Sequence, residues 1–252
     1  RAMYLNYSNH WGHDQYDHLS IGLYHGGVCY LPDLGYPFTW EYRNVWDGNL
    51  YMHNTVTVDE TFGQHTCPMG RANMLVEEGP LHVISAAADP YIYHEELNPD
   101  VPDLDLYERT SVMVDVSDEE YYLLDLFVVS GGTQHDQSWH GPICDVQKPD
   151  LDWTDQETGT LAGPDVEQFA EWTDSRGRKR TGPFSFLANV SRATTTHSCT
   201  FSWDMGLDVG AQMRLSIVPV DGPVQLVTSS GRSPARPPDW SIDYLFVRRD
   251  VK

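Results

Sequence analysis

The sequence lacks the short motifs that mark several common enzyme classes. It contains no G-x-S-x-G nucleophile elbow, no P-loop and no glycine-rich dinucleotide fingerprint. A serine or cysteine nucleophile therefore has no motif to support it. The four cysteines include no CxxC pair, which excludes a zinc ribbon and leaves open one or two disulfides or free thiols.

Positive charge and long apolar runs are also scarce. There are 16 Lys and Arg residues against 37 Asp and Glu residues, which gives a formal net charge of −21. A protein that binds nucleic acid or an anionic membrane would have the opposite balance. No apolar run reaches the roughly 18 residues that a membrane-spanning helix needs. This composition is typical of a soluble protein outside a cell, so we expect a secreted or periplasmic location.

The sequence is rich in the alternation of apolar and polar residues that half-buried strands show. The clearest case predicts a long antiparallel hairpin from residues 107–116 and 121–130, with an acidic turn at 117–120. Further strands are expected, among others, at 19–24, 26–32, 53–59, 81–88 and 184–190. We predict an all-β fold, a large antiparallel β-sandwich that forms a single domain over residues 1–252.

A polar stretch with frequent Pro and Gly interrupts the strands at about residues 145–183. We expect a long excursion from the sandwich there, with one short helix at 165–172. The chain begins with Arg1 and ends just after a strand expected at 243–249. We therefore expect it to be a fragment of a larger protein.

Titratable side chains crowd the stretch NHWGHDQYDHLSIGLYHGGVCYLPDLGYP at residues 9–37. His13 and Gln15 lie two apart and so share one face of a strand, Asp33 follows the next strand, and His53 precedes a third. Imidazole, amide and carboxylate groups together are able to hold a divalent cation such as Zn²⁺. The alternative is that these are polar strand-edge groups satisfied by backbone and water. We assign to that second class the neighbouring His10, Asp14, Asp17 and His18.

Three phrases in order resemble the heparinase II/III-like polysaccharide lyases. They are GHDQYDHLSIGLYHGGVCYLPDLGYP, then HNTVTVDE followed shortly by Gln64, then YYLLDLFVVSGGTQHDQSWHG. The matching order and spacing cover residues 9–142, roughly half of the chain. The resemblance implies that an N-terminal (α/α) toroid precedes the sandwich and that this chain is the β part alone.

The resemblance also implies roles for individual residues. His13 matches the catalytic histidine of the family, and Gln15 matches a metal-ligand position at which many members have His. Asp33 and His53 match the other two ligands, so the implied cofactor is a divalent metal, zinc first, held by Gln15, Asp33 and His53. The residues expected to contact substrate in the cleft are Tyr16, Tyr36 and His140.

The chemistry implied is β-elimination on an acidic, uronate-containing polysaccharide. A base removes the proton α to the uronate carboxylate, an acid protonates the leaving oxygen, and the developing charge must be neutralised. In the family, the acid/base Tyr and the neutralising Asn or His lie in the toroid and are absent from this sequence. Whether this chain acts as an enzyme on its own therefore stays open.

Other classes of function also stay open. The chain is alternatively a non-catalytic, metal-stabilised carbohydrate-binding or structural module. A jelly-roll metal oxygenase is a third possibility, although cupin sites usually include a His-x-His pair and a nearby Glu that this sequence does not show. A homo-oligomer is also left open.

Overall fold

The computed structural model describes residues 1–7, 15, 17–33, 35, 46, 48–60, 66–90, 104–118, 120–173, 177, 179–181, 183–206, 210–232 and 241–251. Of residues 66–69, 89–90, 172–173, 179–181 and 183, it describes the backbone alone. Over these residues the chain forms strands and only short helical turns, and every strand pair is antiparallel. The all-β prediction is confirmed. No helix in these ranges is long and apolar enough to cross a membrane.

The first sheet contains β1 (Ala2–Leu5), β2 (Ile21–His25) and β3 (Val28–Leu31) in that order. Gly26 and Gly27 form the turn between β2 and β3 with positive φ angles of 58° and 80°, a conformation that glycine adopts without strain. The residues before β2 and after β3 are therefore brought to the same end of this sheet.

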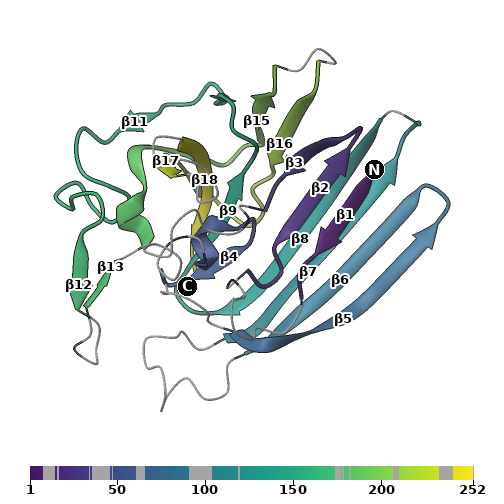
Figure 1. Ribbon diagram of the computed structural model, residues 1–252, viewed down its shortest axis with the longest axis horizontal. Helices are drawn as coiled ribbons and strands as arrows, with labels where there is room; N and C mark the ends of the chain where they lie inside the picture. The colour runs from purple at the N-terminus through teal and green to yellow at the C-terminus, as the bar shows by residue number, and fades with distance from the viewer. Residues whose placement is uncertain are drawn as a thin grey trace.

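Two long hairpins build the second sheet, in the order β5 (Thr66–Glu78), β6 (Leu81–Pro90), β7 (Leu104–Asp115) and β8 (Tyr121–Gly131). The β7–β8 hairpin lies where the alternation predicted it. The sheet of β1 to β3 lies across β7 and β8 (Figure 1), and the ring of His25 stacks on that of Tyr121 with centroids 5.1 Å apart.

A third sheet of six strands has the order β11, β14, β17, β18, β9, β4. Its strands are β4 (Val56–Val58), β9 (Gln134–His140), β11 (Thr154–Asp155), β14 (Ala188–Thr195), β17 (Val224–Arg232) and β18 (Ser241–Asp250). A fourth sheet contains β10 (Val146–Gln147), β15 (Cys199–Asp204) and β16 (Gln212–Ile217). The strands β12 (Glu171–Thr173) and β13 (Lys179–Thr181) form a separate pair.

The largest core cluster joins four of these sheets. It packs apolar side chains of β2, β3, β7, β9, β15, β16, β17 and β18 together, among them Ile21, Met113, Trp139, Phe201 and Leu245. Such burial is the dominant stabilising contribution in a fold of this size. The three cysteines whose side chains are described, Cys29, Cys144 and Cys199, are free thiols.

Two local predictions are wrong. Residues 165–172 form turns and the start of β12 instead of a helix, because the backbone there bonds to other segments: the amide of Phe169 donates to the carbonyl of Ser185 at 3.0 Å. Phe169 has a positive φ of 65°, which a helix does not allow. The strand expected at 184–190 begins only at Ala188, after the 3₁₀ helix η4 (Pro183–Phe186).

Candidate metal centre

Three titratable residues from separate segments converge at one end of the β1–β3 sheet. Asp17 precedes β2, Asp33 follows β3, and His53 ends the short 3₁₀ helix η3 (Leu50–Met52) just before β4. One ligand atom from each of the three lies within 4.8 Å of the others. The open end of the β2–β3 hairpin thus lies next to the residue that precedes β4 of the six-stranded sheet.

The imidazole of His53 is buried, with no hydrogen bond to either ring nitrogen from the residues that the structure describes. The residue is 1% exposed, and among those residues neither Nδ1 nor Nε2 has a hydrogen-bond partner. The nearest carboxylate oxygen described is Oδ2 of Asp33, 3.7 Å from Nδ1, which is too long for a hydrogen bond. Burying two polar nitrogens without hydrogen bonds costs stability, and a ligand bound to the ring would compensate for this cost.

Each carboxylate of the centre has one oxygen engaged by the protein. Oδ1 of Asp33 accepts the amide of Gly35 at 2.7 Å, and Oδ2 of Asp17 accepts the side-chain amide of Asn6 at 2.5 Å. Burial raises the pKa of the Asp17 carboxyl above its usual value, against an opposing contribution from His53. A nearly buried acid, Asp17, and a more exposed one, Asp33, are thus held beside the buried imidazole of His53.

This donor set fits a divalent cation. Two carboxylates and one neutral imidazole are ligands that zinc accepts, with a fourth position left for water or another side chain. A cation would also compensate the charge of two neighbouring carboxylates, which otherwise repel each other. Asp17 was not among the ligands expected from the sequence. The sequence analysis assigned it to the polar strand edge, and its burial comes from contacts with other segments, such as the hydrogen bond from Asn6.

Gln15 lies beside this group. Its side-chain Nε2 donates to the carbonyl of Gly35 at 2.9 Å, and the amide of Gly35 in turn donates to Asp33. Gln15 is thus linked to the centre through a single residue, and its role as a ligand stays a prediction.

The guanidinium of Arg109 connects the segments that carry two of the three ligands. Arg109 is fully buried on β7, and it binds Asp125 of β8 through two hydrogen bonds of 2.8 and 2.9 Å. Its Nη1 donates to the carbonyl of Leu19 at 2.6 Å and to the carbonyl of Asn54. Leu19 is two residues from Asp17 and Asn54 is next to His53, so one side chain fixes the spacing between them.

Buried hydroxyls also bond to this backbone. Oγ1 of Thr55 donates to the carbonyl of His18 at 2.6 Å, and Oγ of Ser138 on β9 donates to the carbonyl of His53, also at 2.6 Å. The hydroxyl of Tyr107 donates to the carbonyl of Val56 at 2.5 Å. A satisfied polar network of this kind rigidifies the groups it supports.

The structure places His140, expected near the substrate, in the interior. It is 1% exposed, and its backbone amide donates to the side-chain oxygen of Asn54 at 2.8 Å. Burial, with a further contribution from His53, lowers the pKa of His140 to about 4, so its ring is neutral at ordinary pH. His140 is therefore an interior residue, bonded through its backbone to Asn54, the neighbour of His53. The other predicted site residues, His13, Tyr16 and Tyr36, lie outside the described residues.

Two tyrosines beside the centre were not expected from the sequence. Tyr4 and Tyr24 are 36% and 40% exposed, and their ring centroids lie 6.2 Å apart at an interplanar angle of 32°. The ring of Tyr4 lies over Gly22, where an added Cβ would come within 2.0 Å of Cε1 of Tyr4. Burial is the main cause that raises the pKa of Tyr4, and the charge of Asp33 adds to it.

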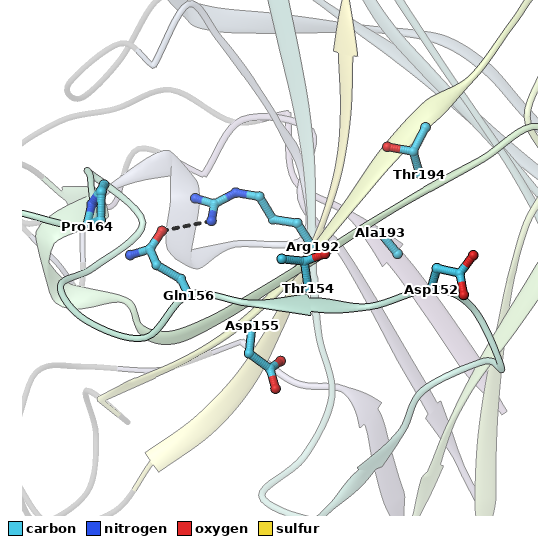
Figure 2. A pocket seen from close by; sticks show the side chains of 8 residues that line it. All are labelled: Asp152, Thr154, Asp155, Gln156, Pro164, Arg192, Ala193 and Thr194. Carbon is cyan, nitrogen blue, oxygen red and sulfur yellow. Dashed lines mark hydrogen bonds between the residues drawn. The ribbon is translucent and has the colours of Figure 1, made fainter.

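A separate open pocket of about 700 Å³ lies between β11 and β14 (Figure 2). Within it, Nη1 of Arg192 donates to Oε1 of Gln156 at 2.7 Å. The pocket shares no lining residue with the metal centre, and Asp152 and Asp155 in its wall disfavour an anionic ligand.

Solved structures that share this fold include two of one lyase. Heparan sulfate lyase HepC from Pedobacter heparinus matches with a TM-score of 0.53, and a mutant of the same lyase matches with a TM-score of 0.54. In both cases the sequence identity is 14%, and the match covers 99% of this chain and 30% of that chain. The likeness shows the fold, and this chain spans less than a third of the length of those lyases. No protein-family model matches the sequence, and no curated protein does either.

Proposed function

We propose that this chain is the β-sandwich portion of a polysaccharide lyase that cleaves uronate-containing glycans by β-elimination. The observation that carries the proposal is the fold, which over 99% of the chain is that of a heparan sulfate lyase. The convergence of Asp17, Asp33 and His53 at one sheet end supports it, because it supplies a built site at the position that the sequence motifs point to.

In this proposal the metal has a structural role. A bound divalent cation such as zinc supplies fixed positive charge that holds three chain segments together. Asp17, Asp33 and His53 would be its ligands from this chain, with Gln15 as a further candidate. Arg109 keeps the Asp17 and His53 segments at a fixed spacing by binding the carbonyls of Leu19 and Asn54.

In this proposal, His13 and groups outside this chain carry out the proton transfers. His13 would serve as the base at the carbon α to the uronate carboxylate or as a partner of that carboxylate. The acid that protonates the leaving oxygen, and the amide or imidazole that neutralises the carboxylate, would come from an N-terminal helical toroid.

Tyr4 and Tyr24 would bind the glycan next to this site. The apolar face of a pyranose ring packs well on an aromatic ring, and the two exposed rings lie 6.2 Å apart on the paired strands β1 and β2. They carry no charge at neutral pH, because a hydrogen bond with Cys29 and burial raise the pKa of Tyr24 to about 12 and burial raises that of Tyr4 further. An anionic glycan is therefore not repelled by them.

The same aromatic pair favours one alternative, a carbohydrate-binding module with a structural metal and no turnover. Binding through Tyr4 and Tyr24 requires no toroid, whereas β-elimination does. The lyase would cleave a uronate glycan, whereas the binding module would bind it without cleavage.

Ultraviolet absorbance of the unsaturated uronate product distinguishes the two. We expect the native-length polypeptide to generate this absorbance on heparan sulfate, alginate or a glucuronan. His13→Ala should slow it about a hundredfold or more while glycan binding persists. Absence of product on all three substrates, with binding intact in both proteins, would replace the lyase by the binding module.

A further inference from the structure

The sheet formed by β5 to β8 has one face that no described element covers. We call it the outer face; it is the side opposite the one that carries Arg109 and Met113. On β8 its residues are Tyr122, Leu124, Leu126 and Val128, and these side chains are 56%, 52%, 51% and 52% exposed. Large apolar groups exposed in such a row are unusual for a soluble protein and mark an interaction site.

The strand register extends this row across the sheet. Leu124 is paired with Val112, which is paired with Val83, which is paired with Val76, so one apolar side chain from each strand lies in line. The neighbouring line runs from Tyr122 through Val114 to Leu81, which is 43% exposed. These two lines are apolar from β8 to β6, whereas the line from Leu126 to Met74 passes through Thr110 and Ser85, whose hydroxyls bond each other at 2.8 Å.

β8 itself has the composition of a strand that is covered on both sides. Its other face carries Tyr121 and Leu123, which pack against the main core, and Phe127, which packs against a second cluster. Strands with one solvated face alternate apolar and polar residues, whereas strands buried on both faces form continuous apolar runs. The sequence YYLLDLFVVS follows the second pattern, although the structure covers only one side.

The charged groups of the outer face lie to either side of its central lines. Glu108 of β7 is paired with Val128 and Ala87, with its Oε1 3.4 Å from Nη2 of Arg71, and Glu78 is paired with Leu81. The two lines between them, which carry Leu124 and Leu126, contain no charged group, in a chain whose formal net charge is −21. Two copies of so acidic a protein repel each other, and an uncharged surface is where they are able to meet at the lowest electrostatic cost.

From these observations we infer that the outer face of β5 to β8 is an interface between two copies of this chain. Four strands spaced about 4.8 Å apart and about 10 residues long present roughly 600 Å² per copy. The pair would bury about 1,200 Å², above the roughly 1,000 Å² that a specific interface needs. Two such sheets would stack face to face at about 10 Å with aligned strands, as in a β-sandwich.

Sedimentation equilibrium of the 252-residue chain tests this inference independently of the proposed lyase function. We expect a species of twice the 28.6 kDa chain mass, with a dissociation constant on the order of micromolar. Added salt should strengthen association, because it screens the repulsion between the two acidic copies. Leu124→Lys and Leu126→Lys should each weaken association at least about tenfold, because each copy would bring a charge into an uncharged contact.

The matched control is Val218→Lys, at an apolar residue that is 63% exposed after β16 and does not belong to the outer face. It should leave association unchanged, and circular dichroism should confirm that all three variants fold. A chain that stays monomeric at concentrations up to about 100 μM overturns the inference. The outer face would then be assigned to contact with another segment or protein. A dimer that both lysine variants leave intact overturns it as well.

Discussion

Arg109 and Asp125 form a two-pronged ion pair between β7 and β8, with Nε to Oδ1 at 2.8 Å and Nη2 to Oδ2 at 2.9 Å. The remaining nitrogen of the guanidinium reaches the carbonyls of Leu19 and Asn54. The sheet of β5 to β8 contributes none of the three candidate ligands. Through Arg109 it nevertheless sets the spacing between the segments that carry Asp17 and His53.

Replacing Arg109 by Met should affect both stability and metal binding. The free energy of unfolding should fall by about 3–5 kcal/mol, because Asp125 is left as a nearly buried, unpaired charge. Zinc affinity should fall about 10- to 100-fold, as expected for a group that orients ligands from outside the metal's own contacts. Denaturant titration and calorimetry measure the two effects.

Arg248→Met is the matched control for that change. Arg248 binds the buried Asp136 with the same two-pronged geometry, at 2.7 and 2.9 Å, but has no described contact with Asp17, Asp33 or His53. It should lower stability while zinc affinity stays at the wild-type value. If Arg109→Met and Arg248→Met weaken zinc binding equally, Arg109 has no positioning role.

Metal removal should destabilise the chain. An ion present at a hundred times its dissociation constant stabilises the native state by about 2.7 kcal/mol. For a chain of this size, chelation should therefore lower Tm by about 5–10 °C, and added zinc should restore it. Differential scanning fluorimetry of wild type and His53→Ala checks this, since the variant should not respond to the chelator. A wild-type Tm that ignores chelation contradicts a structural metal.

Loss of either exposed ring should weaken glycan binding. Tyr4→Ala and Tyr24→Ala should each reduce affinity for a uronate oligosaccharide up to about tenfold, which corresponds to one stacking contact. Tyr4→Phe should retain wild-type affinity, because the ring is kept. Gly22→Ala should act like Tyr4→Ala, because its Cβ would come within 2.0 Å of that ring. Isothermal titration gives these affinities.

The control for the aromatic pair is Tyr122→Ala. Tyr122 is 56% exposed but lies on the outer face of β8, so its loss should leave glycan affinity unchanged. Equal effects of Tyr4→Ala and Tyr122→Ala would show that the tyrosines near the centre have no special part in binding.

Acid should remove a stabilising contribution of Asp59. Burial raises the pKa of its carboxyl, but hydrogen bonds from Thr133 and Gln134 at 2.7 to 2.8 Å outweigh burial, and the charge of His135 adds to them, so the pKa lies below its usual value. The stabilisation is therefore complete above the unfolded-state pKa of about 3.9 and is lost as pH falls through the lower folded-state pKa.

Asp59→Asn isolates this effect. Asn tolerates the positive φ of 51° at this position, so backbone strain does not change. At neutral pH the variant should lose about 1 kcal/mol, a modest value because the carboxylate is exposed. The difference from wild type in urea titrations should shrink below about pH 4. A difference for Asp59→Asn that persists at low pH would assign its effect to something other than charge.

The strands were predictable where runs of strand-forming residues are bounded by turn residues, as in the β7–β8 hairpin and at Gly26–Gly27. The failures lie where other segments decide the backbone. Phe169 is fixed by the carbonyl of Ser185, and its ring meets the edge of Phe186 at 4.9 Å, neither of which is visible in a local pattern.

The candidate metal centre, too, was only partly predictable from the sequence. Asp33 and His53 were selected by motif, and the structure brings them together, but their meeting depends on how β4 pairs with β9 and on the contacts of Arg109. Asp17 was assigned to the polar strand edge because only its tertiary surroundings, Asn6 and His53, make it a buried acid.

The most direct test is anomalous diffraction at the zinc edge from crystals of the chain grown with zinc. We expect one ion with oxygen atoms of Asp17 and Asp33 and a nitrogen of His53 at about 2.0–2.3 Å. Zinc bound elsewhere, or no ordered zinc with the three side chains positioned as described, would contradict the metal centre.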